Sequence, residues 1–404
     1  MNLPGSDRAK RASTAKPVNP APATKSKTPS AETREGVADS SADMRQGPRR
    51  GKVAIAMPPA ALESAAHRYR PCGDWEGLTV QILVTGGAGY IGSHTCLALS
   101  AMGIRPVTLD SLVTGHEWAV QWGPLEQGDV RDTAFVRQVI ERHRIEAVIH
   151  FAALSLVAES VREPLRYDDN NVAGTLSLLA AMDQCGVTRL VFSSTCAVYG
   201  VPPGLPLAET MPTAPVNPYG RSKLAAENAI LDAVQAGRLD AVVLRYFNAA
   251  GADTDLRIGE AHAPESHLIP LALRAARLQQ DPLEIFGTDY PTPDGTCQRD
   301  YIHVSDLADA HLAALRFVAG NRGGHRFNLG TGVPVSVREV LAAVEAAVGK
   351  PVPVIEAPRR AGDPPALYAA TDLAQRTLGW APRHPAIGDI VRSAAAWDAR
   401  QNRR

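Results

Sequence analysis

The chain has no surplus of either charge and no long apolar run. Its 404 residues include 42 acidic and 42 basic side chains, so the net charge is zero with histidine neutral. A general binder of nucleic acid or anionic membranes carries a clear positive surplus, and a membrane-spanning helix needs about 18 or more consecutive apolar residues. We therefore expect neither a nucleic acid nor a membrane as partner.

Cysteine is scarce and lacks the paired spacing of a zinc site. The five cysteines are scattered and odd in number, without a CxxC pair: Cys72, Cys96, Cys185, Cys196 and Cys297. Such usage is typical of a reduced, cytoplasmic protein. The sequence predicts no metal site.

Residues 1–79 lack the periodic apolar positions of a folded segment. The stretch "RASTAKPVNPAPATKSKTPSAE" is rich in Ala, Pro, Ser, Thr and Lys. Such a segment buries too little apolar surface to offset the entropy lost on ordering. We interpret residues 1–79 as disordered, or as a non-native extension produced by a misassigned start codon. A secretory h-region is missing, and four acidic residues argue against a transit peptide.

Short apolar runs alternate with helical patterns from residue 80 onward. The predicted strands are 80–85, 106–110, 147–153, 189–194 and 241–247, and the helical segments between them end in glycine. This alternation predicts an α/β fold: a Rossmann-like parallel sheet with helices on both faces.

The chain is expected to divide near residue 250. Residues 80–250 are predicted to form the dinucleotide-binding domain. Prolines and loops increase in 251–404, which we expect to form mainly a smaller, mixed α/β substrate domain with some strands returning to the first. Helices are predicted there near 266–280, 305–318 and 336–348.

The first predicted strand runs into the glycine-rich stretch "TGGAGYIGSH". Gly86, Gly89 and Gly92 match GxxGxxG, a spacing that lets backbone approach a pyrophosphate at a helix N-terminus. A glycine-rich turn without a ligand has the same pattern. The preceding strand, the following helix and Asp110, 18 residues past Gly92, favour a dinucleotide. Because a carboxylate there binds ribose hydroxyls and repels a 2′-phosphate, the predicted cofactor is NAD.

Polar side chains follow two other predicted strands. Asp129 in "QGDVRD" is placed either to reach an adenine or to act as a solvated turn acid. Ser193, Ser194 and Thr195 end the strand 189–194. A hydroxyl at this strand end can hydrogen-bond a substrate hydroxyl, or it can cap the strand end.

Tyr219 and Lys223 occur in "NPYGRSK", where Pro218 suits the start of a helix. Residues four apart share a helix face, so both side chains can enter one pocket. Lowering a tyrosine pKa from ~10 to ~7 requires ~4 kcal/mol, which nearby cations in a partly dry site can supply. The alternative is an exposed helix face, but the glycine-rich turn and the strand-end hydroxyls favour a catalytic pair.

These motifs together resemble the sugar-nucleotide 4-epimerases of the extended short-chain dehydrogenase/reductase family, over about residues 80–400. The matching stretches occur in order, and the most specific is the block "GTDYPTPDGTCQRDYIHVSDLADAH". The resemblance implies reversible C4 epimerisation of UDP-glucose and UDP-galactose, through a transient 4-keto sugar and tightly bound NAD. It also implies a UDP-sugar substrate and a homodimer.

The resemblance implies roles for individual residues. Tyr219 would be the general base, Lys223 its partner and ribose anchor, and Thr195 the hydroxyl that holds the sugar oxygen. The implied cofactor contacts are Gly86, Gly89, Tyr90, Ile91, Gly92, Asp110, Asp129, Val130, Phe151, Ala152, Ala153, Asn170 and Lys223. The implied sugar-nucleotide contacts are Thr195, Tyr219, Asn248, Leu268, Phe286, Arg299, Arg360, Asp363 and Leu367.

Some positions depart from the family's pattern or separate its activities. Ser155 stands where many members have a lysine, and His267 where some have asparagine. Cys196 and Ala197 replace the acidic pair of the family's dehydratases, which disfavours water elimination. Epimerisation of another UDP-sugar (pentose, uronate or N-acetylhexosamine) remains an alternative. A nucleotide-sensing protein is disfavoured because a sensor needs no base such as Tyr219.

Overall fold

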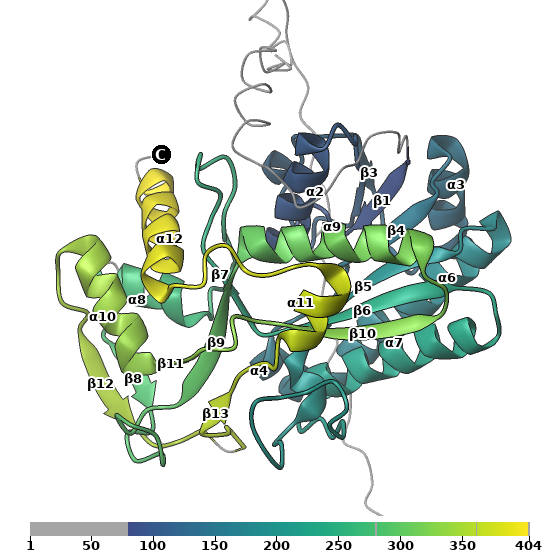
Figure 1. The fold of residues 1–404 in the computed structure, drawn as a ribbon. Coiled ribbons are helices and arrows are strands. Elements are labelled where there is room, and N and C mark those ends of the chain that lie inside the picture. Colours follow the sequence, from purple (N-terminus) through teal and green to yellow (C-terminus); the bar gives the residue numbers. More distant parts are fainter. Residues whose placement is uncertain (1–79, 279–280, 361, 403–404) are drawn as a thin grey trace, which may run out of the picture. The chain divides into compact units, whose positions relative to one another are not determined.

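The computed structural model describes residues 80–278, 281–360 and 362–402, so the N-terminal segment interpreted above lies outside the described residues. A large parallel sheet with helices on both faces lies beside a smaller group of strands and helices (Figure 1). The predicted α/β fold class is confirmed.

The large sheet has seven strands in the order β10-β6-β5-β4-β1-β2-β3, and neighbouring strands run parallel. The order reverses at β1 and β4, and ligands of such sheets bind at the carboxyl ends of the strands beside that point. The strands are β1 (Ile82–Thr85), β2 (Val107–Asp110), β3 (Leu125–Gln127), β4 (Ala147–His150), β5 (Arg189–Thr195), β6 (Asp240–Tyr246) and β10 (Gly324–Leu329).

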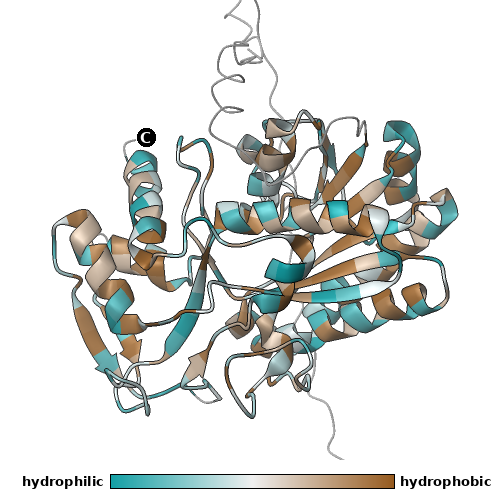
Figure 2. Ribbon diagram, viewed as in Figure 1, coloured by the Kyte–Doolittle hydropathy of each residue, from teal (hydrophilic) through white to brown (hydrophobic). Residues whose placement is uncertain are grey.

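Both faces of this sheet are covered, which explains why its strands read as continuous apolar runs. Ile82 and Val84 of β1 pack into one buried cluster and Leu83 into the opposite one, since successive side chains alternate between faces. Figure 2 shows the hydrophobic residues along these strands. The first face is covered by α2 (Tyr90–Ala101), α9 (Val304–Gly320) and α11 (Asp372–Leu378), and the second by α3 (Thr133–His143), α6 (Gly174–Cys185) and α7 (Pro218–Gln235).

The predicted strands 80–85, 106–110, 189–194 and 241–247 match β1, β2, β5 and β6. The run 147–153 differs, because β4 ends at His150. The amides of Phe151 and Ala152 both bond the Thr85 carbonyl oxygen, at 2.9 and 3.1 Å, and the chain leaves the ladder there. These apolar residues therefore lie beyond the carboxyl ends of the central strands β1 and β4 instead of extending β4.

The smaller part has two short sheets. One contains β9 (Gln298–His303), which pairs with β7 (Asn248–Ala250), β11 (Pro334–Ser336) and β13 (Ala366–Leu367); in the other, β8 (Leu283–Phe286) pairs with β12 (Val354–Ala357). Its helices α8 (Leu268–Ala276), α10 (Val337–Val348) and α12 (Ile387–Gln401) share one buried cluster. The predicted helices near 266–280 and 336–348 are α8 and α10. The third, near 305–318, is α9, which packs on α2 over the large sheet.

Short helical segments complete the described elements: η1 (Glu117–Ala119), α4 (Val157–Arg162), α5 (Pro164–Tyr167), η2 (Asp168–Ala173) and η3 (Cys196–Tyr199). None of the helices in the described ranges combines the length and apolarity needed to cross a membrane.

A buried ion pair joins α7 to the large sheet. Arg245 of β6 donates from Nε to Glu227 Oε1 at 3.0 Å, and Ser194 of β5 donates to the same oxygen at 2.5 Å. Arg245 Nη1 also donates to the Tyr199 hydroxyl at 3.0 Å. The side chains of Arg245 and Glu227 are 4% and 1% exposed. Each charge is therefore compensated almost entirely by the other and by these hydrogen bonds.

Arg245→Met should destabilise the fold by ~3–5 kcal/mol, because it leaves the Glu227 carboxylate buried without its cation. Urea unfolding of wild type and variant measures the change. Arg238→Met is the matched control, since the Arg238–Asp183 pair is 64% and 47% exposed and should contribute at most ~1 kcal/mol. Equal losses in both variants would contradict the assignment of a buried, tightly paired charge.

Candidate active site

The turn between β1 and α2 requires glycine at two positions. Gly86 has a φ of +72°, and a Cβ there would lie 2.6 Å from the Ala152 nitrogen. A Cβ on Gly92 would lie 2.2 Å from the Gly86 carbonyl oxygen. The turn therefore packs backbone against backbone, and it lines a cavity of about 480 Å³ beside the N-terminus of α2. Amide groups at such a terminus suit a pyrophosphate, so these residues fit a dinucleotide.

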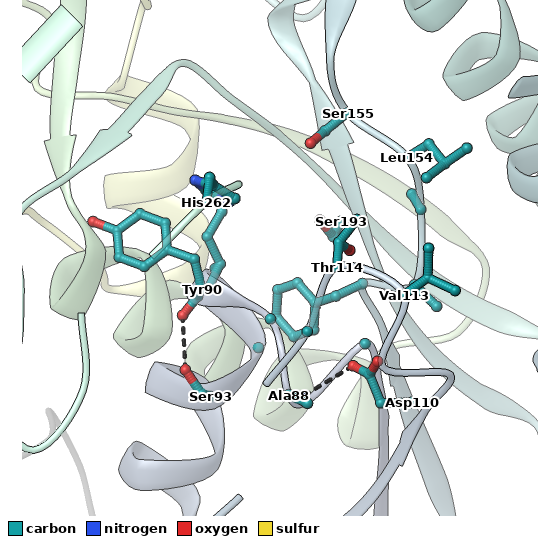
Figure 3. A pocket seen from close by; sticks show the side chains of 18 of the residues that line it. Ala88, Tyr90, Ser93, Asp110, Val113, Thr114, Leu154, Ser155, Ser193 and His262 are labelled. Atoms are coloured by element: carbon teal, nitrogen blue, oxygen red, sulfur yellow. Dashed lines mark hydrogen bonds between the residues drawn. The ribbon is translucent and has the colours of Figure 1, made fainter. Parts of the chain in front are cut away.

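Asp110 ends β2 and lies in the same cavity wall. Its carboxylate accepts from the amides of Ala88, at 3.0 Å, and Leu112, at 2.9 Å; the first of these bonds is drawn in Figure 3. Burial raises the pKa of Asp110, although both amides act in the opposite direction. The carboxylate thus supports the glycine-rich turn as well as lining the cavity.

All the residues implied as cofactor contacts line this one cavity. Asp129 is engaged by Arg131, whose Nε lies 3.0 Å from Oδ1, and this bond holds the pKa of Asp129 below its usual value. Arg131 also contacts Asp169. Ser155 lies in the wall as well, so a hydroxyl occupies the position where a cation is expected from the family.

The three hydroxyls at the end of β5 have different partners. Thr195 and Ser193 line the cavity, where Ser193 contacts the Tyr246 hydroxyl. Ser194 instead donates to the buried Glu227. Thr195 also accepts from the Ala197 amide at 3.1 Å. Thr195 therefore both caps the end of the strand and lines the cavity.

Tyr219 and Lys223 lie on the first turns of α7, and both line the cavity. The helix begins as expected: Pro218 is its first residue, and Asn217 caps it by accepting from the Gly220 amide at 2.8 Å. Lys223 is 3% exposed, and its Nζ lies 4.6 Å from the centroid of the Phe192 ring. The two side chains therefore share a buried pocket instead of an exposed helix face.

Burial dominates the ionisation of this pair. It lowers the pKa of Lys223 to about 7, against the opposing effect of Glu227. It also raises the pKa of Tyr219 well above its usual value, assisted by Tyr246, while a hydrogen bond with Thr195 acts in the opposite direction. The chain by itself therefore keeps the phenol protonated, and a phenolate requires further positive charge in the cavity.

The residues implied as sugar-nucleotide contacts divide into two groups. Thr195, Tyr219 and Asn248 line the cavity, whereas the others belong to the smaller part and do not line it. There, Arg299 pairs with Asp363, and the Arg360 guanidinium carbon lies 3.9 Å from the centroid of the Phe286 ring. Leu268 begins α8 and packs on its cluster, and Leu367 of β13 is in register with Arg299.

Several residues of the site were not predicted. Tyr246 enters the cavity because β6 is in register with β5, pairing Thr195 with Tyr246, and no local motif reveals that pairing. Glu227 follows Lys223 by four positions, so the same helical spacing could have identified it. Glu260, His262, Glu265 and His267 form a cluster whose E-x-H-x-x-E-x-H spacing was available in the sequence.

Comparisons with known proteins identify the family of the chain. A model of the NAD dependent epimerase/dehydratase family matches residues 82–330. The chain is 50% identical over 321 residues to a UDP-glucose 4-epimerase of Rhizobium leguminosarum bv. trifolii, covering 80% of this chain and 98% of the relative.

Solved structures show the same likeness. The UDP-glucose 4-epimerase of Brucella ovis in complex with NAD is 49% identical, with a TM-score of 0.77 over 79% of this chain and 98% of the other. The enzyme of Stenotrophomonas maltophila with bound NAD and formylated UDP-arabinopyranose is 42% identical, with a TM-score of 0.78 over 80% and 99%.

Gly92→Ala should reduce dinucleotide binding at least tenfold, because the added methyl group would lie 2.2 Å from the Gly86 carbonyl oxygen and push the turn into the cavity. Titration of the apoprotein with NAD, followed by tryptophan fluorescence, measures the dissociation constant. Gly320→Ala, in α9, is the control because a Cβ there meets nothing within 4 Å. Wild-type affinity in Gly92→Ala would show that the turn does not hold the cofactor.

Proposed function

This chain belongs to the NAD dependent epimerase/dehydratase family, and we propose that it interconverts UDP-glucose and UDP-galactose by inverting the sugar at C4. The observation that carries the proposal is the convergence of Thr195, Tyr219 and Lys223 on the cavity that contains the glycine-rich turn. A base and a hydroxyl donor beside a dinucleotide site suit reversible oxidation of a sugar hydroxyl.

In this reaction Tyr219 takes the proton of the sugar 4-hydroxyl and later returns it to the 4-keto oxygen. Thr195 holds that oxygen by a hydrogen bond, and Lys223 contributes positive charge and anchors the cofactor ribose. NAD, when bound, supplies reversible acceptance of hydride from C4. The 4-keto sugar rotates between the removal and the return of hydride, while its nucleotide stays bound. The configuration at C4 is therefore inverted. The buried pocket around Tyr219 keeps water from the keto sugar.

The nucleotide end of the substrate is proposed to lie against the smaller part. Arg299 and Arg360 offer guanidinium groups for the diphosphate, and charge-assisted hydrogen bonds of this kind are strong. Asp363 holds Arg299 by an ion pair, and Phe286 lies beneath Arg360. Leu268, at the start of α8, and Asn248, in the cavity, are assigned to the same substrate.

Another UDP-sugar is the alternative substrate. The Stenotrophomonas maltophila structure contains a formylated UDP-arabinopyranose, which favours a pentose as the second candidate. Water elimination is disfavoured because Cys196, in the cavity wall, is not an acid, and burial raises the pKa of its thiol to about 12.

The proposal includes a cytoplasmic homodimer that takes part in galactose metabolism and binds neither nucleic acid nor membranes. The zero net charge and the free state of the four described cysteines support this setting. Val161 of α4, Leu165 of α5 and Leu176 of α6 are 62%, 79% and 50% exposed. We propose that these exposed apolar side chains take part in self-association.

The decisive experiment is incubation of the purified protein with UDP-galactose or UDP-glucose, without added cofactor. Formation of the other sugar to the same final ratio from both sides supports the proposal. Absence of interconversion, with NAD bound and the protein folded, would refute it; assay of UDP-arabinopyranose and UDP-xylose then tests the alternative.

Tyr219→Phe should lower kcat ~10²-fold or more while leaving NAD binding intact, because it removes the proton-accepting hydroxyl and keeps the ring. Stopped assays of UDP-galactose turnover give kcat, and the bound NAD is measured after release by heating. Tyr290→Phe is the control: its hydroxyl lies outside the cavity, and turnover should stay near wild type. Near-normal turnover in Tyr219→Phe would mean that another group takes the proton.

Leu367→Ala should raise kcat/KM for UDP-N-acetylglucosamine and UDP-N-acetylgalactosamine by roughly 5- to 150-fold. The proposed role of Leu367 is to limit space beside the sugar C2, and overpacking a tight site costs ~1–3 kcal/mol. Leu207→Ala is the matched control, since Leu207 belongs to the same apolar cluster and has no proposed sugar contact. An unchanged ratio between N-acetylated and plain sugars would make Leu367 an ordinary packing residue.

A further inference from the structure

The segment 260–267 brings together, beside the cavity, four side chains of types that bind metal ions. Glu260, His262, Glu265 and His267 each present one donor atom, and these atoms lie within 4.8 Å of one another. His267 Nδ1 is 2.7 Å from Glu260 Oε1 and 2.9 Å from Glu265 Oε1. His262 Nδ1 is 3.0 Å from Glu260 Oε1 and 4.0 Å from Glu265 Oε2. We propose that these four side chains bind one divalent transition-metal ion, with Zn²⁺ the best match.

The donor set and the spacing both suit that ion. Two imidazole nitrogens and two carboxylate oxygens are ligands that Zn²⁺ accepts, whereas Ca²⁺ and Mg²⁺ prefer oxygen alone. Bonds of ~2.1 Å in a tetrahedron place neighbouring donors ~3.4 Å apart. The separations run from 2.7 Å to no more than 4.8 Å, on both sides of that value, so modest side-chain shifts would form the site.

The electrostatics of the cluster call for positive charge. The Glu260 and Glu265 side chains are 7% and 1% exposed, and both carboxylates form ion pairs with His262 and His267. A buried carboxylate needs a compensating charge. One proton shared with His267 balances one of the two carboxylates, whereas a divalent ion balances both and leaves the imidazoles neutral.

The cluster also has outer contacts and a path of entry. The Glu265 carboxylate accepts from the amides of Ser266 and His267, at 2.8 and 2.9 Å, and the Glu260 carbonyl accepts from Trp397 at 2.8 Å. Such contacts orient ligands before an ion arrives. Glu260, His262 and Glu265 line a second cavity of about 330 Å³. An ion in that cavity can therefore reach the donors.

The position of the cluster indicates a structural ion. Figure 3 shows His262 beside Tyr90, and the centroids of the two rings are 6.0 Å apart. Tyr90 belongs to the first turn of α2, and its hydroxyl donates to the Gly251 carbonyl at 2.6 Å. An ion at 260–267 would fix one part of the cavity wall, which Glu260, His262 and His267 line together with Tyr90.

The test uses the full chain, freed of any affinity tag and dialysed against EDTA. Titration with Zn²⁺ alone, followed by elemental analysis after gel filtration, should give one ion per chain. Co²⁺ should give the visible absorption of a four-coordinate site. With Zn²⁺ at about 100 times its dissociation constant, the Tm should rise by about 5 °C.

In the double variant His262→Ala/His267→Ala, the affinity for Zn²⁺ should fall by more than ~100-fold. Loss of a residue that only hydrogen-bonds to a metal ligand costs at most about that much. His143→Ala is the matched control: it removes a His–Glu pair, with Glu126 at 2.6 Å, that has no further histidine. It should bind Zn²⁺ like wild type. Bound NAD and the circular dichroism spectrum report folding of each protein.

Three outcomes would overturn the proposal, and the first two can be read from wild type alone. One is less than a tenth of an ion per chain at saturating Zn²⁺. The other is binding without the Co²⁺ spectrum of a four-coordinate site, which would place the ion elsewhere on the chain. Equal affinity in the double variant and wild type would also refute it. Any of these results would mean that a proton shared between His267 and the glutamates, and not an ion, holds the cluster together. This agrees with the effect of the two glutamates, which raise the pKa of that imidazole to about 10 although burial acts in the opposite direction.

Discussion

The buried contact between Glu227 and Arg245 is the constraint on which the geometry of the site depends. Tyr219, Lys223 and Glu227 follow one another at intervals of four along α7, so they lie on one face of the helix. The last of the three is held by Arg245 and Ser194 of the sheet. This attachment sets the height and rotation of α7, and thereby places the phenol and the ammonium group over the end of β5. The ion pair that attaches α7 to the sheet thus also positions Tyr219 and Lys223.

The pleat of β5 divides its hydroxyls between these two tasks. Ser193 and Thr195 point to the cavity side, whereas Ser194, between them, points to the buried ion pair. The parallel register of β5 with β6 aligns Ser194 with Arg245 and Thr195 with Tyr246. Because successive side chains of a strand point to opposite faces, Ser194 serves the buried ion pair and its two neighbours serve the cavity. A slip of a single residue would exchange them.

The sequence allowed much of the fold and the dinucleotide site to be predicted, because both rest on local patterns. Apolar runs revealed β1, β2, β5 and β6, and the spacing of Gly86, Gly89 and Gly92 revealed the turn.

What could not be predicted depends on contacts between distant segments. The position of α9 over the large sheet, and the entry of Tyr246 into the cavity, follow from strand order and register. The ionisation of Tyr219 was expected to respond to nearby cations, whereas in the chain alone burial has the largest effect on the pKa of Tyr219 and on that of Lys223. The grouping of Arg299 with Asp363 was implied only by resemblance to the family, and its role remains a proposal.

The edge strand β10 has a consequence for how the chain folds during synthesis. It completes the large sheet by pairing with β6, yet nearly eighty residues separate the end of β6 from its start, and these build β7, α8, β8, β9 and α9. Until that stretch has left the ribosome, the outer edge of β6 has unpaired backbone groups that can join another chain. The large sheet can therefore be completed only after much of the smaller part has been synthesised.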